Sequence, residues 1–327
     1  MNVTVLGAGG WGTALARLLC LADHTVTLWG HNPNRLEEIR RTGCNNRYLP
    51  GVQLPKNCVL QSDLPVAVSS AECVVVAVPS KVFREVTCCL DCFDRPVVSV
   101  TKGIEDDSGL TMCGVLQQTA PRCQPVALSG PTLALEVARD YPSAIVAASR
   151  DAASAQIVQR LFHRPAFRVY TSTDVTGVEL GGALKNVIAI AAGTCDGLNF
   201  GDNSKAALIT RGIVEVRRLG VACGAQAETF AGLSGLGDLT VTCFSRLSRN
   251  RGLGERLGRG EKLCDLLTNM ITVAEGYPTA RSAYQLARKQ GVTTPIIDEV
   301  YAMLYEGKNV GQALRDLTSR DSKAEDG

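Results

Sequence analysis

The sequence of 327 residues contains few histidines and few aromatic side chains. It has three histidines and two tryptophans, and aromatic residues make up 5% of the chain. Cys89 and Cys92 form the only Cys-x-x-Cys pair. With so few imidazoles and no second such pair, a zinc site or a thioredoxin-type motif has little support. We therefore predict no bound metal, and we expect Cys89 and Cys92 to pack in a helix.

The chain also lacks an excess of charge and a long apolar run. Its formal net charge is +2, and no Lys/Arg run points to nucleic acid or to a membrane surface. The N-terminus enters a strand-like stretch without a basic leader, so no signal peptide is expected. The apolar run around Lys185 is too short, and too rich in glycine and alanine, for a membrane span. These features predict a cytoplasmic protein with no nucleic-acid partner and no stable membrane insertion.

Cysteine, in contrast, is plentiful, and the chain is long enough for two cores. The thirteen cysteines are scattered singly through apolar runs, which favours reduced core thiols in a cytosolic protein over a disulfide framework. The hydrophobic share of 45% and the charged share of 20% are ordinary for a globular protein. A chain of 327 residues accommodates two domains.

The N-terminus carries a dinucleotide-binding pattern. Residues 2–6 are predicted to form a strand, followed by Gly7-Ala8-Gly9-Gly10-Trp11-Gly12, a helix over 13–21 and a second strand over 25–29. In this arrangement Gly7 allows a tight turn, Gly9 lets the backbone approach a pyrophosphate, and Gly12 lets the helix pack on the strand. Glycine-rich turns also serve purely structural ends, but the strand–turn–helix–strand context favours dinucleotide binding.

The end of the second predicted strand bears on the choice of cofactor. An acidic residue there would hold the ribose 2′-hydroxyl of NAD. The sequence has Trp29-Gly30-His31-Asn32 instead, with no carboxylate. His31 and Arg35 are compatible with a 2′-phosphate, although His31 also fits a simple exposed loop. We therefore predict that NADPH is accepted and leave NADH open.

Further apolar strands predict a Rossmann-type α/β domain. They span residues 74–78, 97–100, 125–128, 144–148 and 167–170, and they alternate with polar or helical segments as in a mostly parallel sheet. Ligands bind beyond the carboxyl ends of such strands, where Lys102 follows one of them. Beyond residue 173 the patterns are helical. We expect a dinucleotide-binding domain over 1–173 and an all-α substrate and catalytic domain over 174–327.

Two stretches of the second half contain candidate functional residues. The run from Gly181 to Gly193 is apolar on nearly every face, which indicates a buried helix, yet it contains Lys185. A buried lysine with a lowered pKa serves as a general acid or base, whereas a lysine at a helix edge reaches water. Further on, Ser248-Arg249-Asn250 supplies a hydroxyl, a guanidinium and an amide, suited either to a phosphate or to an ordinary polar loop.

Together these residues resemble the bacterial-type NAD(P)-dependent sn-glycerol-3-phosphate dehydrogenases, from Asn2 to about Leu317. The resemblance rests on the order and spacing of eight short motifs. They are Gly7 to Gly12, Asn46-Arg47-Tyr48-Leu49-Pro50, Thr101-Lys102-Gly103, Ser129-Gly130-Pro131, Gly182-Ala183-Leu184-Lys185-Asn186, Gly235-Leu236-Gly237-Asp238-Leu239, Ser248-Arg249-Asn250 and Val273-Ala274-Glu275-Gly276.

The resemblance implies an oxidoreductase that interconverts dihydroxyacetone phosphate and sn-glycerol 3-phosphate with NADPH or NADH, for glycerophospholipid synthesis. It makes Lys185 the proton donor and acceptor. The implied substrate residues are Lys102, Gly130, Thr132, Lys185, Asp238, Ser248, Arg249 and Asn250. The implied cofactor residues are Gly7, Gly9, Gly10, Trp11, Gly12, His31, Tyr48, Lys102, Ala134, Arg249, Val273 and Glu275.

Two positions depart from the family pattern, and other readings stay open. Gly10 replaces the usual serine, so a hydroxyl contact is lost there. Thr132-Leu133-Ala134 replaces Ser-Phe-Ala, which keeps the hydroxyl but loses an aromatic contact.

A related two-domain β-hydroxyacid dehydrogenase is the alternative enzyme, and a cofactor-binding redox sensor without chemistry is the alternative from another class. A homodimer is compatible with the resemblance.

Overall fold

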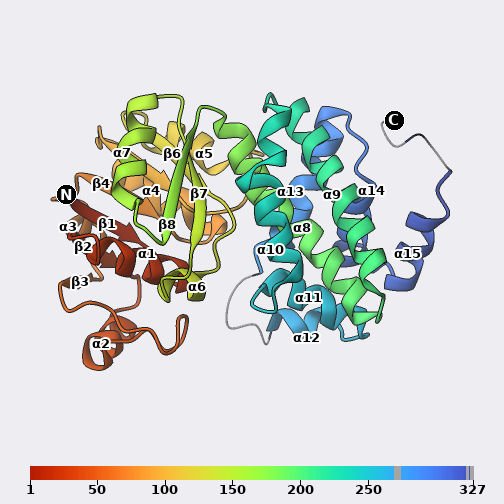
Figure 1. The fold of residues 1–327 in the computed structure, drawn as a ribbon, viewed down its shortest axis with the longest axis horizontal. Coiled ribbons are helices and arrows are strands. Elements are labelled where there is room, and N and C mark those ends of the chain that lie inside the picture. The colour runs from red at the N-terminus through yellow and green to blue at the C-terminus, as the bar shows by residue number, and fades with distance from the viewer. Residues whose placement is uncertain (269–273, 322–323, 325–327) are drawn as a thin grey trace.

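The computed structural model describes residues 1–268, 274–321 and 324. Figure 1 shows a sheet with its covering helices on one side and a bundle of helices on the other. The sheet is built from the first half of the chain and the bundle from the second. The predicted fold class, a Rossmann-type sheet followed by a helical half, is confirmed.

The sheet has eight strands in the order β3-β2-β1-β4-β5-β6-β7-β8. Neighbouring strands are parallel except for β6 and β7, which are antiparallel. The mostly parallel sheet therefore agrees with the prediction. The strands are β1 (Asn2–Leu6), β2 (Thr25–Trp29), β3 (Cys58–Gln61), β4 (Cys73–Val76), β5 (Pro96–Ser99), β6 (Gln124–Ser129), β7 (Ser143–Ala148) and β8 (Phe167–Ser172).

Both faces of the sheet are covered, because successive strand residues point to opposite faces. In β4, Val75 packs with helices on one face while Val74 and Val76 pack with helices on the other. The first face is covered by α1 (Gly10–Cys20) and α7 (Ala152–Phe162). The second is covered by α3 (Leu64–Val68), α4 (Phe83–Thr87) and α5 (Met112–Thr119). Such two-sided burial explains why the central strands are apolar at every position.

Two expectations need correction. The strand β3 was not predicted, because it is a four-residue edge strand whose side chains are mostly half-buried, so the sequence shows no apolar run there. The expectation that Cys89 and Cys92 pack in a helix is wrong for Cys92, which lies exposed in a turn after a short 3₁₀ segment over Cys88–Leu90. All thirteen cysteines are free thiols.

The helices of the second half surround α8 (Val175–Gly197). Asp174 caps α8 by accepting a hydrogen bond from the Gly177 amide at 2.9 Å, at the predicted helix start. This helix is long and apolar enough to span a membrane, but 89% of its apolar window is buried inside the protein. The remaining helices are α2 (Pro33–Thr42), α6 (Ala134–Ala138), α9 (Asp202–Ala222), α10 (Asp238–Phe244), α11 (Arg249–Gly258), α12 (Leu263–Thr268), α13 (Gly276–Gln290), α14 (Pro295–Tyr305) and α15 (Val310–Thr318).

Glycines bring α8 and α11 into backbone contact. A methyl group on Gly193 would collide with the Arg251 carbonyl oxygen, and one on Gly254 would collide with that of Ile190. Gly258 is similarly close to the Thr194 carbonyl, at 2.6 Å from the position of a Cβ. Small residues at this spacing let two helix backbones approach closely. The glycines of the second half therefore hold α11 against the helix that carries Lys185.

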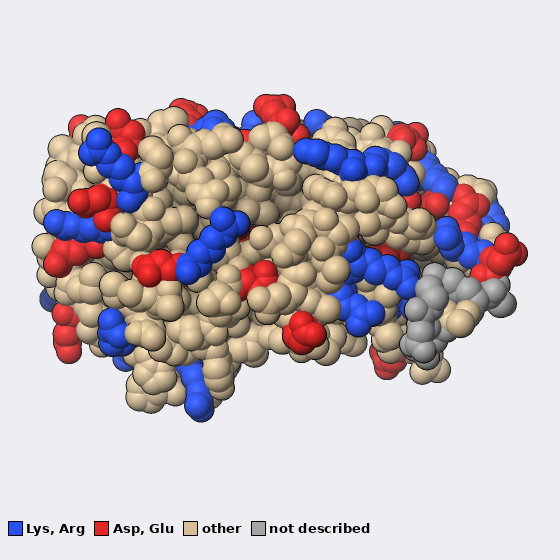
Figure 2. All heavy atoms as spheres, turned by 90° about the horizontal axis from the view of Figure 1, so that it is seen from above, with Lys and Arg blue, Asp and Glu red and all other residues tan. Residues whose placement is uncertain are grey.

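The surface charge is mixed. Figure 2 shows basic and acidic side chains interspersed among uncharged atoms on the upper face. This distribution gives no single-sign field over that face. The absence of a nucleic-acid partner stays a prediction.

Candidate active site

The glycine-rich turn has the geometry that a dinucleotide needs. Gly7 has a φ of +121°, and a Cβ there would lie 2.7 Å from the Ala77 carbonyl oxygen, so only glycine fits. A Cβ on Gly12 would collide with the Gly7 carbonyl. At Gly9 nothing lies within 4 Å of a Cβ position, and no side chain caps the first amides of α1. The turn is thus closed towards the protein and open where a pyrophosphate would approach a helix N-terminus.

A loop over residues 44–52 lies against this turn. The Asn45 amide nitrogen donates to the Ala8 carbonyl at 3.0 Å and to the Thr13 hydroxyl at 2.8 Å. Leu49 belongs to a small apolar cluster against which Trp11 and Ala134 of α6 pack. The Tyr48 carbonyl lies 2.7 Å from where a Cβ of Gly10 would be. Tyr48 is therefore fixed beside the turn, and the glycine at position 10 has a local steric reason.

The second half of the candidate site is a chain of three charged groups. Lys185 Nζ donates to Asp238 Oδ1 at 2.5 Å and to Thr242 Oγ1 at 2.6 Å. The other oxygen of Asp238 accepts from Lys102 Nζ at 2.6 Å, and Lys102 also donates to the Gly130 carbonyl at 3.1 Å. Asp238 is 1% exposed and Lys185 is 6% exposed. The buried carboxylate thus links a lysine from the loop after β5 to a lysine from the helical bundle.

The local folding of the second half explains how these groups meet. Leu233–Gly237 forms a π-helical turn directly before Asp238, the first residue of α10. A Cβ on Gly181 would lie 2.6 Å from the Ser234 carbonyl, so α8 can touch this turn only through glycine. A Cβ on Gly182 would lie 2.5 Å from Ser129 Oγ, which explains the glycine on the side that faces β6. The two glycines before Lys185 therefore let α8 fit between the sheet and α10.

Burial changes the acidity of Lys185. Removal from water lowers the pKa of Lys185 to about 8, against the attraction of Asp238, which raises that pKa. The positive charge of Lys102 lowers it further. The structure therefore supports the interpretation of Lys185 as a buried lysine over that of a lysine that reaches water at a helix edge. Such a group reaches equal populations of its charged and neutral forms at about pH 8, and it is therefore closer to exchanging a proton at neutral pH than a solvated lysine is.

Glu275 lies over the carboxyl ends of β4 and β5. Its Oε2 accepts a hydrogen bond from Ser80 Oγ at 2.7 Å, and it lies 3.8 Å from where a Cβ of Gly103 would be. Desolvation raises the pKa of the Glu275 carboxyl, while the hydrogen bond from Ser80 lowers it. The predicted cofactor residue Glu275 is thus at the ligand edge of the sheet. Val273, also predicted to contact the cofactor, lies outside the described residues.

The Ser248-Arg249-Asn250 segment forms the start of α11. Ser248 caps the helix by accepting from the Arg251 amide at 3.2 Å. Asn250 is buried and ties three helices, since its Nδ2 donates to Asn186 Oδ1 at 2.8 Å and its Oδ1 accepts from the Gly276 amide at 2.9 Å. Arg249 is exposed, and it makes no ion pair within 4 Å with any carboxylate of the described chain. Of the three, Arg249 has the side chain most free to bind an anion.

The remaining predicted residues lie around the same edge. Thr132 is half-buried, and its hydroxyl donates to the Gly130 carbonyl at 3.1 Å. His31 is exposed and follows β2. The preceding Gly30 touches the glycine-rich turn, because a Cβ there would lie 3.0 Å from that of Ala8. Of the predicted cofactor and substrate residues, the structure therefore places the described ones at the sheet's carboxyl edge and on the facing helices.

Sequence reasoning missed three polar residues of the site. Thr242 binds both Lys185 and the Asp238 carbonyl, Asn186 binds Asn250, and Ser80 binds Glu275. Thr242 lies four residues after Asp238, on the same helical face, and this spacing could have identified it. Ser80 follows the predicted strand over residues 74–78, and Asn186 belongs to the motif that contains Lys185. Their contacts join segments far apart in the sequence, so neither position indicates its partner.

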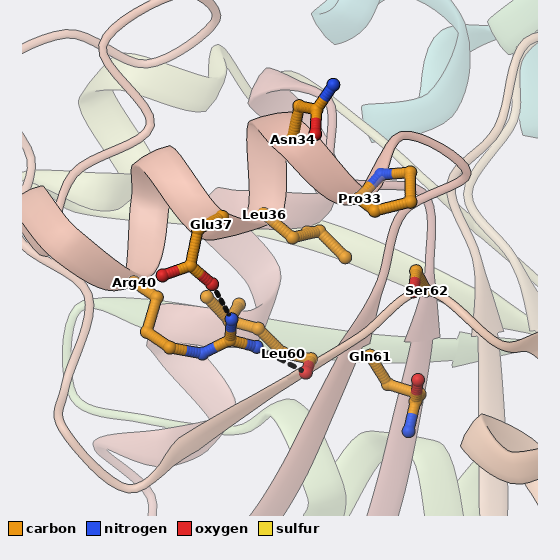
Figure 3. Close-up of a pocket in the computed structure, with 8 residues that line it drawn as sticks. All are labelled: Pro33, Asn34, Leu36, Glu37, Arg40, Leu60, Gln61 and Ser62. Carbon is orange, nitrogen blue, oxygen red and sulfur yellow. Dashed lines mark hydrogen bonds and ion pairs between the residues drawn. The ribbon is translucent and has the colours of Figure 1, made fainter.

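A separate cavity of about 250 Å³ lies beside α2 and β3. Figure 3 shows its lining, with the Arg40 guanidinium bonded to Glu37 and to the Leu60 carbonyl. None of the predicted catalytic or cofactor residues lines it. Among the described residues, no group of three or more His, Cys, Asp or Glu side chains is arranged to hold a metal ion.

Comparisons with known proteins agree with this geometry. Residues 2–155 match the model of the NAD-dependent glycerol-3-phosphate dehydrogenase N-terminus, and residues 174–315 match that of its C-terminus. The chain belongs to the NAD-dependent glycerol-3-phosphate dehydrogenase family. A glycerol-3-phosphate dehydrogenase [NAD(P)+] of Geobacter sulfurreducens is 51% identical over 99% of this chain and 98% of its own length. That of Syntrophotalea carbinolica is 49% identical over 99% of both chains.

Solved structures of this family have the same fold. A glycerol-3-phosphate dehydrogenase from Coxiella burnetii superposes with a TM-score of 0.94 at 35% identity, covering 98% of this chain and 99% of that one. A D-mandelate dehydrogenase with NADH superposes with a TM-score of 0.63 at 12% identity, covering 94% of this chain and 98% of that one, which shows a shared fold alone. The family resemblance predicted from the eight motifs is confirmed.

Proposed function

We propose that the chain interconverts dihydroxyacetone phosphate and sn-glycerol 3-phosphate with NAD(P)H, and so supplies glycerol 3-phosphate for glycerophospholipid synthesis. The observation that carries this proposal is the Lys185–Asp238–Lys102 chain, which places a buried proton donor at the ligand edge of a dinucleotide-binding sheet. Membership of the glycerol-3-phosphate dehydrogenase family supplies the substrate.

The residues that would hold the cofactor fit a dinucleotide. The open backbone at Gly9 and the uncapped start of α1 suit its pyrophosphate, and Gly10, Trp11 and Tyr48 surround the same turn. Lys102 and Glu275 lie farther along the carboxyl edge. When bound there, NADPH or NADH supplies the hydride for the reduction and NAD(P)+ accepts it in the reverse direction.

Lys185 is proposed to hold and move the proton. During reduction, negative charge grows on the C2 oxygen of the substrate, and the charged ammonium stabilises it and then donates a proton from Nζ. In the reverse direction, neutral Lys185 takes the proton of the C2 hydroxyl. Asp238 orients Nζ by its hydrogen bond, and Thr242 fixes it from a second side. Lys102 adds positive charge from the sheet.

The substrate phosphate is proposed to bind at the start of α11. Arg249 supplies a guanidinium that makes no ion pair within 4 Å in the described part of the chain, although Glu275 lies near enough to oppose the lowering of its pKa by desolvation, and the helix N-terminus favours an anion. Ser248 and Asn250 would add hydroxyl and amide contacts beyond the protein hydrogen bonds they already make. Gly130 and Thr132 would face the glycerol part from the end of β6.

Initial rates test the activity. Purified protein is assayed for oxidation of NADPH and of NADH with dihydroxyacetone phosphate, and in reverse with sn-glycerol 3-phosphate. β-Hydroxy acids serve as competing substrates for the related dehydrogenase class. We expect turnover of the glycerol phosphate pair alone. Turnover of a β-hydroxy acid instead would overturn the substrate assignment, and cofactor binding without turnover of any small phosphate would favour a sensor.

Three finer expectations accompany this function. The domain boundary is proposed near residue 173, between the last residue of β8 and the cap of α8, giving units 1–173 and 174–327. The free thiols support a reducing, cytoplasmic location. A homodimer is compatible with the family resemblance, and light scattering of the purified protein measures its mass directly.

A further inference from the structure

A small cavity is lined by the carboxyl ends of β5 and β6 and by helix α8. Its volume is about 10 Å³, and Ser99, the last residue of β5, and Ser129, the last residue of β6, both line it. Glu179 of α8 lines it from the helical bundle, and Lys102 lines it from the loop after β5. A cavity of this size has room for one water molecule and for nothing larger.

Three polar atoms of this lining have no partner within the described chain. Ser99 Oγ, Ser129 Oγ and Glu179 Oε2 are buried, and none of them makes a hydrogen bond with another atom of the described residues. Ser99 and Ser129 are each 3% exposed, and Glu179 is 8% exposed. Two further buried side-chain atoms of the described chain lack a hydrogen bond, but Arg251 Nε and Glu299 Oε2 are both in ion pairs at 2.6 Å. The uncompensated polar atoms thus gather in one cavity.

The sheet register places the two serines on the face that packs against α8. Ser99 pairs with Ala127 across β5 and β6, and Ser129 lies two residues after Ala127. Paired residues of adjacent strands, and residues two apart in one strand, share a face of the sheet. A Cβ on Gly182 would lie 2.5 Å from Ser129 Oγ, so this face is turned to α8. Glu179 lies three residues before Gly182, on the same side of that helix.

The carboxyl group of Glu179 is fixed by one of its oxygens. Glu179 Oε1 accepts a hydrogen bond from the Cys113 amide at 2.8 Å, at the start of α5. This bond holds the side chain in place and leaves Oε2 for a partner in the cavity. Three converging groups from two halves of the chain therefore share one small space.

Water matches the chemistry of these groups. A water molecule donates two hydrogen bonds and accepts two, and buried waters make about three. It can donate to Glu179 Oε2 and to one serine oxygen, and accept from the other serine hydroxyl. The positive charge of Lys102 on the same lining disfavours a metal ion, and the Glu179 carboxylate disfavours an anion.

We propose that this cavity binds one internal water molecule, through which Glu179 positions the two strand ends that lead to Lys102 and Gly130. Ser99 lies three residues before Lys102, and Ser129 directly precedes Gly130, whose carbonyl accepts from Lys102 Nζ at 3.1 Å. The water joins both strand ends to the helix of the proposed proton donor. Ser99, Ser129 and Glu179 are thus positioning residues. This inference rests on the proposed function, because it takes these loops to hold the substrate.

A high-resolution crystal structure of the wild-type protein tests the water site. Density for one water molecule is expected at about 2.7–3.2 Å from Ser99 Oγ, Ser129 Oγ and Glu179 Oε2. The double variant Ser99→Ala/Ser129→Ala should lose this density, because a single partner is left in the cavity. A wild-type cavity without water, or one in which the three atoms bond directly to protein groups, would overturn the inference.

Kinetics then test the positioning role. Ser129→Ala should raise the KM for dihydroxyacetone phosphate by about three- to tenfold, as expected for one lost hydrogen bond, with kcat and the NADPH dissociation constant changed by less than about twofold. Glu179→Gln keeps an oxygen for the Cys113 amide and gains an NH₂ group that donates to the water, so it should retain both the water and the KM. Ser149→Ala is the matched control, because Ser149 Oγ donates to the Pro125 carbonyl at 2.9 Å, at the opposite end of β6. It should lower the urea midpoint and leave the KM unchanged.

Two kinetic results would overturn the positioning role. One is the same KM for Ser129→Ala as for Ser149→Ala, and the other is a loss of turnover in Glu179→Gln, which would make Glu179 a proton-transfer group instead. If the wild-type crystal holds the water but the enzyme reduces no dihydroxyacetone phosphate, the water site stands and the proposed substrate fails. If wild type reduces the substrate and its cavity holds no water, the enzymatic function stands and this inference fails.

Discussion

Lys185 shows how the surroundings of a residue change its acidity. Its helix is almost entirely buried, and among the described residues the ammonium donates to Asp238 and Thr242. Burial disfavours the charged form and Asp238 favours it, and the balance leaves the pKa of Lys185 at about 8. A solvated lysine would stay charged at neutral pH and would be a poor base. The acidity of Lys185 thus depends on the depth of the helix as well as on the residue type.

The pKa of Lys185 predicts opposite pH profiles for the two reaction directions. Reduction needs the charged ammonium, so its kcat/KM should be level below about pH 8 and fall tenfold per pH unit above it. Oxidation needs the neutral amine, so its kcat/KM should rise up to about pH 8 and then level off. Thr242 accepts a hydrogen bond that favours the charged form, so Thr242→Val should move both limbs to lower pH. Parallel profiles in both directions would rule out this role.

A substitution at Gly9 should affect cofactor affinity much more than the free energy of unfolding. A methyl group there meets no protein atom within 4 Å, so Gly9→Ala should cost no more than about 1 kcal/mol of unfolding free energy. The same methyl group would occupy the space of the pyrophosphate, and NADPH affinity should fall at least about tenfold. Gly12→Ala is the contrasting variant, because its methyl group collides with the Gly7 carbonyl and should destabilise the fold itself. Urea unfolding and cofactor titration give both quantities.

At the scale of elements, the contact between α8 and α11 positions the catalytic half. Gly193, Gly254 and Gly258 allow the two backbones to meet, and Asn250 adds hydrogen bonds to α8 and to the start of α13. This packing aligns the start of α11, with Arg249, and the stretch of α8 that carries Lys185. A change in the crossing of these helices would therefore disturb both the proposed phosphate site and the proposed proton donor.

Two glycines of α11 give a matched test of that contact. Gly254→Ala places a methyl group on the Ile190 carbonyl and should destabilise the protein by about 2 kcal/mol or more, with loss of activity. Gly252→Ala places it in open space on the same helix and should be neutral or stabilising by up to about 1 kcal/mol. Denaturant unfolding of both variants measures the difference. Equal stabilities would show that α8 and α11 do not touch at these glycines.

Local patterns predicted most elements but fewer contacts. The apolar strands, the turn at Gly7 and the capped start of α8 were predictable, because burial and turn geometry constrain neighbouring residues. The edge strand β3 was not, since it is short and half exposed. Lys185 was identified as a lone charge in an apolar helix, but its partner Asp238 lies 53 residues away. Long-range pairs such as Ser80 with Glu275 depend on the assembled fold.

At the scale of the whole molecule, hydrogen bonds among the described residues join the first half of the chain to the helical bundle. They connect Lys102 with Asp238, Ser80 with Glu275, the Cys113 amide with Glu179, and Ser282 with both Asp106 and the Ile104 carbonyl. Both halves thus contribute to one site, which is closed only when they are docked. The Lys102–Asp238 pair is at the same time a link between the halves and the orienting group for Lys185.

Removal of the bridging carboxylate should therefore weaken the whole fold. Asp238→Asn leaves Lys185 and Lys102 facing each other without a counter-charge, and breaking such a buried pair costs about 3–5 kcal/mol. Glu261→Gln is the control, because it breaks the exposed pair with Arg256 and should cost less than about 1 kcal/mol. Guanidinium unfolding curves measure both. A cost for Asp238→Asn as small as that of the control would contradict the bridging role.

The most direct test of the central claim is the rate of dihydroxyacetone phosphate reduction by Lys185→Met. Methionine fills the buried site without a charge. Lys185→Ala is the second variant, in case the methionine side chain changes the packing around this position. The account predicts that both variants bind NADPH with nearly unchanged affinity. Their kcat should fall at least about 10³-fold, because they lose both the proton donor and the positive charge that stabilises the developing negative charge on the C2 oxygen. A variant that binds NADPH and turns over at a near-normal rate would contradict the assignment of Lys185.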